Sequence, residues 1–506
     1  MSHLPVTPLS KFGDLLRRYG GVIRAIQWFI ILFYLFLLLI PAFMSLPPDK
    51  ARVLNNLTLF AQFVFWGIWW PFVLLSMVLF SRAWCGIFCP EGALAELASK
   101  YGKNKGAPNW LKWNGWPAIA FILTTLYGQM ISVYDYAKPA LLILGGSTLA
   151  AVGIGLFYGR NKRVWCKYLC PVSGVFSLLA RLAPLHFKVD EERWKENPEP
   201  HLPVPNCAPL VDIRRMHGAS SCHTCGRCSG QRDAVRLATR SVNEEIVDYG
   251  QEEHNPWLIH LLLFGILGVA IGAFTWTVSP WFIAYKQAIA EWLVVHGVYW
   301  PLNQDTPWWL FTHYPENNDA FNWVDGFCVV TYILGHGVVL GSVFSLVMFI
   351  ASKITQQGKV FYTHFCLALI PLGAAGLFLG LTATTVKLIR QNGFAILWVQ
   401  DVRLMLLLCS TIWSLILAYR VVKKYPLNLI QQLGSMLCFT FVCAIVFYNW
   451  YLMFWGWGHL SLFKLSTLVN LVVYAATLVI FIIIVKLLFK RLNKPLKSKT
   501  IKVTQL

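Results

Sequence analysis

Long apolar runs, separated by shorter polar segments, set the organisation of this chain. A helix rises about 1.5 Å per residue, so about 20 apolar residues cross the roughly 30 Å of hydrocarbon in a bilayer. The sequence therefore predicts an all-α polytopic membrane protein with about ten transmembrane helices. The ten runs cover residues 22–45, 57–80, 115–134, 139–159, 257–281, 324–351, 360–386, 404–422, 428–453 and 464–487.

One long polar segment, residues 160–256, interrupts this pattern. It is too long for a connector and too polar for a span, so we expect a small cytoplasmic, ferredoxin-like, cysteine-rich insert. The insert divides the chain into an N-terminal membrane domain of two helical hairpins (1–159) and a C-terminal membrane domain of about six helices (257–506). The residues before the first run are polar to mixed, which favours an uncleaved first helix over a secretory signal.

The distribution of Lys and Arg predicts the orientation of the helices. Basic residues cluster before the first run, after the second, after the fourth and at the C-terminus, whereas the loop 283–323 holds only Lys286. Because cytoplasmic loops carry the excess of basic residues, both termini and the insert are expected in the cytoplasm of a bacterial inner membrane. Lys387, Arg390 and Arg403 run against this pattern, since they fall on the outer side.

Composition supports the membrane class and explains the charge. The chain is 57% hydrophobic and 13% charged, with a formal net charge of +20, whereas soluble domains carry about 25% charged residues. The basic residues flank the apolar runs, so we assign them to the cytoplasmic loops and to anionic lipid at the inner face. No nucleic-acid-binding motif accompanies the charge, and we expect no nucleic acid partner.

An internal repeat carries the first candidate chemistry. Residues 82–90 and 163–171 both read R-x-W-C-x3-C-P, and each follows the inner end of a helical hairpin. A pseudo-twofold relation would bring the two pairs together at the inner face. A proline suits the first position of a helix, so the preceding cysteine is N-cap-like, and a helix N-terminus stabilises a thiolate. We expect metal-binding or redox-active thiols at Cys85, Cys89, Cys166 and Cys170.

The insert carries the second candidate site, a C-x2-C-x2-C motif at Cys222, Cys225 and Cys228. This short spacing lets three thiolates bind three irons of one [4Fe–4S] cluster, and Gly226 permits the turn between them. A ferredoxin motif would place its fourth cysteine at Arg232, so the fourth ligand comes from elsewhere. Cys207 is the nearest cysteine in sequence. Structural zinc and a disulfide are less favoured alternatives in this pattern and compartment.

Eight cysteines thus face the cytoplasm, the number needed for two [4Fe–4S] clusters. In one partition the C-x3-C-P residues share a cluster and Cys207 joins the C-x2-C-x2-C motif. In the other, a cysteine of a C-P pair completes the C-x2-C-x2-C cluster. The remaining cysteines lie on apolar runs and are expected to be inert: Cys328, Cys366, Cys409, Cys438 and Cys443.

Together the motifs resemble those of the membrane polyferredoxins. That group includes the NapH-type ferredoxin of periplasmic nitrate reductase, the NosR-type protein of nitrous-oxide-reductase maturation and the CcoG-type cytochrome oxidase assembly protein. The resemblance covers about residues 57–240 and implies electron transfer between quinol or cytoplasmic donors and an extracytoplasmic acceptor. The oxidase-assembly member of the group is associated with copper reduction. The chain departs from the family in its single incomplete ferredoxin motif and in the spans after residue 256.

The leading functional hypothesis is a 4Fe–4S electron-transfer protein, the component of an oxidoreductase system, whose partners are the quinone pool or a redox protein. The alternative is a metal-handling or assembly factor that binds or reduces copper, since soft thiolates suit Cu(I) as well. A transporter with a structural cluster is a third, less favoured class. Two histidines, His260 and His364, share a depth near the inner surface and are candidates for a haem or quinone site. Loop 283–323 is the candidate contact for a periplasmic partner.

Overall fold

A computed structural model describes residues 6–455 except 49, 197–204, 254, 395 and 397. It is helical almost throughout, with two short antiparallel strand pairs, β1–β2 and β3–β4. Contacts place the described residues up to 450 in one compact unit, and the three-part division at residues 159 and 256 stays a sequence-based prediction. The all-α polytopic class is confirmed. The α-helices are α1 Pro8–Arg18, α2 Gly20–Ala42, α3 Leu57–Gln62, α4 Trp70–Phe80, α5 Pro90–Tyr101, α6 Trp116–Met130, α7 Ala137–Ala140, α8 Gly146–Phe157, α9 Val164–Tyr168, α10 Ser173–Leu179, α11 Glu191–Glu196, α12 Glu244–Val247, α13 Pro256–His260, α14 Ala270–Thr275, α15 Pro280–Val295, α16 Trp323–Thr355, α17 Gly358–Leu367, α18 Ile370–Gln391, α19 Val399–Val422 and α20 Leu429–Trp455, and the strands are β1 Leu185–Val189, β2 Val235–Thr239, β3 His313–Tyr314 and β4 Asp319–Ala320.

Eight helical stretches of the described residues are long and apolar enough to cross a membrane. Each corresponds to one of the ten expected runs. The third expected run forms only the 15-residue helix α6, which is shorter than a full span. The tenth run, residues 464–487, lies outside the described residues. The eight stretches are Gly20–Ala42, Leu57–Phe80, Ala137–Phe157, Pro256–Val278, Trp323–Thr355, Gly358–Gln391, Val399–Val422 and Leu429–Trp455.

Local sequence signals explain where several helices begin. Asn322 caps α16 by accepting a hydrogen bond from the Asp325 backbone, and the Asp325 carboxylate accepts one from the Asn322 backbone, which is a capping box. Pro256 opens α13 behind the N-cap Asn255. Such caps satisfy backbone groups that the first helical turn leaves free.

Close contacts between small residues bring the helices together. A methyl group on Gly268 would lie 2.8 Å from the Gly337 Cα atom, so the π-helical segment η8 (Leu261–Val269) and α16 touch backbone to backbone. In an apolar solvent, packing of this kind replaces the hydrophobic effect as the force between helices.

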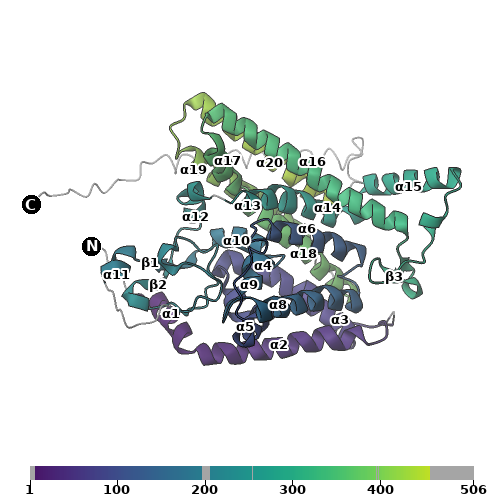
Figure 1. Ribbon diagram of the computed structural model, residues 1–506. Coiled ribbons are helices and arrows are strands. Elements are labelled where there is room, and N and C mark those ends of the chain that lie inside the picture. Colours follow the sequence, from purple (N-terminus) through teal and green to yellow (C-terminus); the bar gives the residue numbers. More distant parts are fainter. Residues whose placement is uncertain are drawn as a thin grey trace, which may run out of the picture. The chain divides into compact units, whose positions relative to one another are not determined.

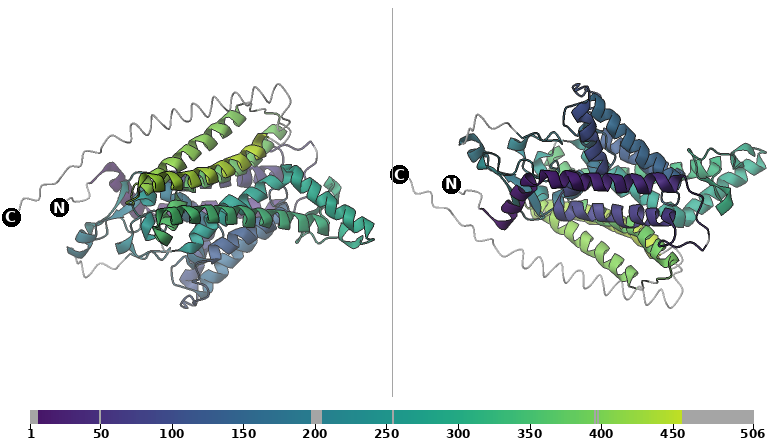
Figure 2. Two further views of the ribbon diagram at one scale, coloured as in Figure 1. Left: turned by 90° about the horizontal axis from the view of Figure 1, so that it is seen from above. Right: turned by 90° about the horizontal axis from the view of Figure 1, so that it is seen from below.

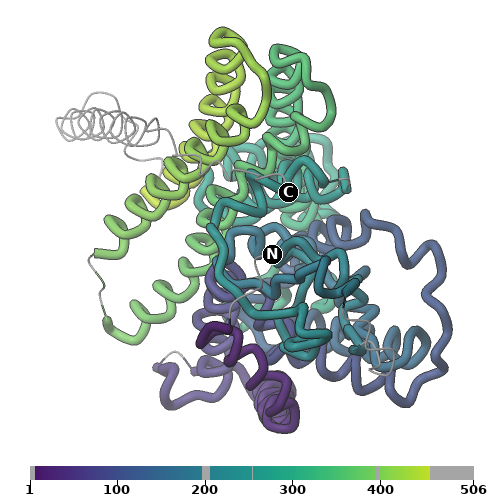
Figure 3. Tube along the Cα trace, turned by 90° about the vertical axis from the view of Figure 1, so that its left-hand side faces the viewer, coloured from purple at the N-terminus to yellow at the C-terminus, as the bar shows by residue number. Residues whose placement is uncertain are grey.

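The insert and the loop 283–323 lie at opposite ends of the long helices. Strands β1 and β2 and helix α1 gather at one end, and α15 with β3 lies at the other (Figures 1 and 2). Viewed from the first end, the insert lies in front of the helices (Figure 3). β1 pairs with β2 in an antiparallel register from Leu185 opposite Thr239 to Val189 opposite Val235. This pair frames the polar segment that carries the cysteines.

Candidate iron–sulfur site

The two C-x3-C-P segments have the same local geometry at their second cysteine. The Cys89 N–H donates to the carbonyl of Trp84 at 2.9 Å, and the Cys170 N–H donates to the carbonyl of Trp165 at 3.0 Å. Both bonds reach five residues back, which is the wider turn of a π-helix and is common at functional sites. The repeat in the sequence is therefore a repeat in backbone structure.

The two segments diverge after the second cysteine. Pro90 is the first residue of α5 and Cys89 is its N-cap, whose sulfur accepts from the Gly92 N–H at 3.4 Å. The same expectation was wrong for the second copy, because α10 begins at Ser173 and its N-cap is Val172. There a turn, closed by the Ser173 N–H to the Cys170 carbonyl, separates cysteine from helix.

Both pairs of repeat cysteines line one small cavity of about 80 Å³. It is closed mainly by aromatic and aliphatic side chains, among them Trp84 and Phe176. Burial raises the pKa of the Cys166 thiol to about 12 and that of Cys89 and Cys170 well above the usual range. A buried thiolate set of this kind requires cations beside it.

The other four cysteines gather in the insert. Cys207, Cys222 and Cys228 pack against one hydrophobic cluster, and neighbouring thiols contribute to the raised pKa of Cys228, after burial. Cys225 is among those neighbours and also influences Cys207. The structure thus groups Cys207 with the C-x2-C-x2-C motif, as in the first of the two partitions.

The motif loop turns as its glycine suggested. Gly226 has φ +77° and Thr224 has φ +48°, so the loop passes twice through the left-handed region. A side chain at Gly226 would also meet the Leu16 Cβ atom of α1 at 2.5 Å. Arg232, at the place of the missing ferredoxin cysteine, instead lies over the Trp194 ring and donates to the Trp194 carbonyl.

The backbone of the first C-x3-C motif packs directly against the backbone of the C-x2-C-x2-C loop. A methyl group on Gly86, inside the first C-x3-C motif, would lie 2.1 Å from the His223 carbonyl oxygen and 3.1 Å from the Cys225 Cα atom. On the other side, the Arg163 N–H donates to the Ala208 carbonyl at 2.8 Å, next to Cys207. The insert cysteines therefore lie against both repeats.

The repeated arginines, whose roles the sequence did not indicate, join the repeats crosswise. Arg82 of the first copy donates to the Ser173 hydroxyl of the second at 3.1 Å and to the Ser220 carbonyl of the insert at 3.1 Å. Arg163 of the second copy donates to the Cys85 carbonyl and to Glu96 of α5. Both side chains are buried. In the sequence, the sign of these roles was that an arginine stands at the same position of both repeats.

Glu96 connects three segments through charge. Its carboxylate pairs with Arg163 at 2.8 Å and with Arg227 of the insert loop at 2.6 Å. Burial by itself would raise the pKa of Glu96, but the two guanidinium groups hold it below its usual value. This ion pair network fixes α5, the second repeat and the C-x2-C-x2-C loop relative to one another.

These residues fit [4Fe–4S] clusters. Each cysteine group supplies four thiols, the ligand set of such a cluster, and the buried Arg82 and Arg163 supply positive charge beside them. Two buried atoms near the cysteines, Arg82 Nε and His223 Nδ1, have no hydrogen-bond partner among the described residues. No three described His, Cys, Asp or Glu side chains are placed to hold a single metal ion, but the four thiolates of a cluster bind four different irons and stand farther apart.

The two candidate histidines have other contacts. His364 is fully buried, with Nδ1 at 3.0 Å from the Tyr425 hydroxyl and Nε2 at 2.8 Å from the Ile246 carbonyl. His260 has Nδ1 at 2.7 Å from the Pro256 carbonyl and is exposed. Both nitrogens of His364 thus contact protein atoms, and the bond to Ile246 joins α17 to the insert. These contacts give the haem hypothesis no support.

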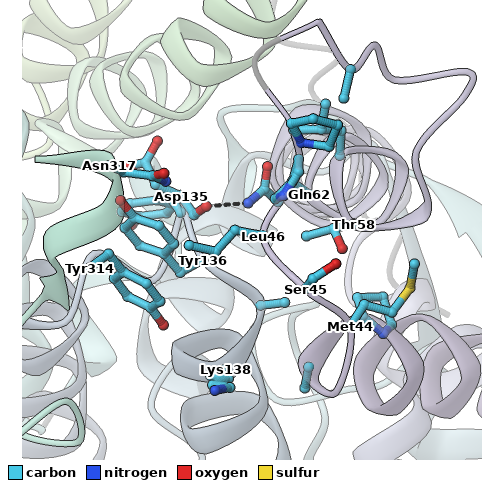
Figure 4. Close-up of a pocket in the computed structure, with 18 of the residues that line it drawn as sticks. Met44, Ser45, Leu46, Thr58, Gln62, Asp135, Tyr136, Lys138, Tyr314 and Asn317 are labelled. Carbon is cyan, nitrogen blue, oxygen red and sulfur yellow. Dashed lines mark hydrogen bonds between the residues drawn. The ribbon is translucent and has the colours of Figure 1, made fainter. Parts of the chain in front are cut away.

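A large cavity lies away from the cysteines. It measures about 840 Å³ and is lined partly by the loop 283–323. Several of its lining groups contact one another: Tyr136 stacks on Tyr314 at 3.5 Å, and the Asp135 backbone carbonyl accepts a hydrogen bond from the Gln62 side chain (Figure 4). The Asp135 carboxylate pairs with Lys387 at 2.8 Å. No cysteine lines it, so the cysteine groups remain the candidate redox site.

An ion pair in the insert leads to a first prediction. The Glu245 carboxylate accepts from the Ala219 N–H at 2.8 Å, just before the cysteine loop, and pairs with Arg240 at 2.5 Å. The Glu245→Ala variant would leave the buried guanidinium uncompensated, a change that costs about 3–5 kcal/mol. We expect faster tryptic cleavage of residues 206–253 in detergent-solubilised protein. Glu244→Ala, at the less buried neighbouring position, is the control, and equal cleavage of both variants would contradict this role.

Comparison with known proteins agrees with the geometry. Residues 62–108 and 143–189 each match the 4Fe–4S binding domain, so the two copies of the repeat are two copies of one domain. A putative electron transport protein, YccM, of Escherichia coli is 24% identical over 230 residues, 40% of this chain and 62% of that protein. The regulatory protein NosR of Pseudomonas aeruginosa is 24% identical over 188 residues, 32% of this chain and 25% of NosR.

A third relative carries the ferredoxin type in its name. The methylamine utilization ferredoxin-type protein MauN of Paracoccus denitrificans is 23% identical over 154 residues, 26% of this chain and 53% of MauN. The chain thus spans less than two thirds of each of these relatives. No solved structure matches. The resemblance to membrane ferredoxin-type proteins is confirmed.

Proposed function

We propose that this chain is an iron–sulfur electron-transfer membrane protein with two copies of the 4Fe–4S binding domain, and that it passes electrons between clusters at the cytoplasmic face of the inner membrane and a membrane or periplasmic acceptor. The observation that carries the proposal is the grouping of eight cysteines into two adjacent sets. Cys85, Cys89, Cys166 and Cys170 would hold one cluster, and Cys207, Cys222, Cys225 and Cys228 the other. Bound there, the clusters would supply one-electron chemistry.

The protein's own contribution is to hold the two sets together and to balance their charge. Gly86 lets the insert loop touch the first repeat. Arg82 and Arg163 place positive charge beside the cysteine sulfurs, where it would offset the negative charge of thiolates and of a bound cluster. Hydrogen bonds and net charge around a cluster set its reduction potential, so these arginines would raise the potentials of both sets.

The surroundings suggest where electrons enter and leave. The insert would face cytoplasmic donors and anionic lipid, and loop 283–323, at the other end of the helices, would face a periplasmic partner (Figure 1). A redox protein or the quinone pool would complete the path.

Serine variants of the cysteines test this assignment. Anaerobically purified protein is expected to hold about eight irons with matching acid-labile sulfide, since each [4Fe–4S] cluster has four. Cys207→Ser and Cys225→Ser should each lower iron to about four and remove the same EPR signal. Cys89→Ser should remove the other signal. Cys409→Ser, an exposed cysteine on α19, is the control.

Other outcomes would select the alternatives. An unchanged signal in Cys207→Ser, together with loss of both signals in Cys89→Ser, would assign the fourth ligand to a C-P pair. Copper without iron or sulfide would contradict electron transfer through clusters and favour the assembly factor.

A further inference from the structure

A second large cavity lies among the apolar helices beside the repeat cysteines. Its volume is about 680 Å³, within the roughly 300–1,000 Å³ of small-molecule sites. Its walls come from α4, α6, α8, α10, α14 and α18 and are mainly apolar, with the aromatic rings of Trp66, Trp70, Phe121, Tyr134 and Phe176 among them. A ligand here would reach the site from the lipid phase and would itself be apolar over most of its surface.

This cavity and the cysteine cavity share a wall. Six residues line both this cavity and the 80 Å³ cavity of the repeat cysteines. A single layer of residues therefore separates a ligand from the repeat cysteines, and one of these cysteines belongs to that layer. The shared residues are Trp70, Glu91, Leu144, Cys170, Val172 and Phe176. An occupant would lie within contact distance of a side chain proposed to bind a cluster.

Polar groups mark the end of the cavity near this wall. The Trp165 indole N–H donates to the Glu91 carboxylate at 3.3 Å, and the Ser147 hydroxyl also bonds to Glu91. All three line the cavity. The Glu91 carboxylate, held by these two donors, can accept a hydrogen bond from a hydroxyl at one end of a ligand, while the remaining surface suits a hydrocarbon tail.

We propose that this cavity binds a membrane quinone or quinol, with the ring toward Glu91 and the isoprenoid tail toward the lipid. This proposal rests on the proposed electron transfer, for which the quinone in this cavity would be the lipid-soluble partner. A flat ring with polar oxygens matches aromatic walls with a polar end. A phospholipid matches less well, because the described lining residues include no Lys, Arg or His to meet its phosphate.

Photolabelling with a short-tailed azidobenzoquinone tests the site directly. The probe is applied to the purified holoprotein in nanodiscs, and labelled peptides are mapped by mass spectrometry. Labels are expected within α6, α8 and residues 164–179. Ala150→Trp places a bulky ring in the cavity lining and should lower labelling about tenfold or more, since filling a pocket removes the ligand's volume.

A neighbouring position provides the control. Leu149 precedes Ala150 on α8, is 75% exposed and does not line the cavity, so Leu149→Trp should change labelling less than about twofold. Thr124→Phe fills the cavity from α6 and serves if Ala150→Trp does not fold.

Three results would overturn the site: labels confined to other segments, equal labelling of the Ala150→Trp and Leu149→Trp variants, or displacement of the probe by phosphatidylglycerol but not by unlabelled quinone. Iron, sulfide and EPR signals are measured on the same samples. Intact clusters without specific labelling would contradict only the quinone site, whereas absent clusters would contradict the proposed function.

Discussion

Replacing Gly86 with alanine should separate the two cysteine groups and lower the iron content of the protein. The added methyl would lie 2.1 Å from the His223 carbonyl oxygen, and the atom it meets is backbone, which cannot rotate away. The insert loop must therefore move off the first repeat. Forced overpacking of this kind costs about 1–3 kcal/mol, and here the strain falls on the chain between Cys222 and Cys225. We expect iron to fall to about half, with the loss in the insert signal by EPR.

Gly146→Ala is the matched control for this variant. A methyl group there meets nothing within 4 Å, and alanine is the better helix former. Its iron content and thermal stability should equal or exceed those of the wild type. If the Gly86→Ala protein kept full iron and an unchanged melting temperature, the close contact between the two groups would be wrong.

Removing the charge of Arg163 is the second change with a large expected effect. The Arg163 and Glu96 side chains are 2% and 18% exposed, so the Arg163→Met variant leaves a largely buried carboxylate with only Arg227 beside it. Breaking one side of a buried pair costs about 3–5 kcal/mol. The variant should accumulate poorly, unfold at a lower temperature and lose iron from both cysteine groups.

A conservative variant separates geometry from charge. Arg163→Lys keeps the charge but cannot contact Glu96 and the Cys85 carbonyl together as the guanidinium does, so it should recover stability more than iron content. Arg160→Met removes an exposed neighbouring charge and should behave as wild type. A stable, fully loaded Arg163→Met protein would show that the crosswise bonds between repeats are dispensable.

The helical membrane fold was largely predictable because apolar length determines it. Eight of the nine expected spans that lie within the described residues appear, with boundaries close to those predicted. The run 115–134 was the exception: α6 ends at Met130, where Ser132, at φ +49°, and Asp135 turn the chain. Hydropathy measures how apolar a segment is and does not register the turn that ends it.

The grouping of the candidate cysteines was predictable in part, and the residues that surround them were not. Spacing alone indicated the cysteines, and the repeat indicated that Cys85 and Cys166 are equivalent. The partners of Arg82, Arg163 and Glu96 could not be predicted, because each lies on another segment of the chain. Likewise Pro90 begins a helix and Pro171 does not, although both follow a cysteine in the same motif.

The crosswise arginines also set the order in which the protein can be built. During synthesis Arg82 leaves the ribosome long before its acceptors at Ser173 and Ser220. The first repeat is therefore made before the Arg82 guanidinium can form these two hydrogen bonds. Its cysteine pair has no partner cysteines until the second repeat and the insert have emerged. A complete set of four cysteines therefore exists only once the chain has been made as far as Cys170 in one group and Cys228 in the other, and a nascent chain halted before then presents bare thiols to whatever metal or oxidant reaches it first.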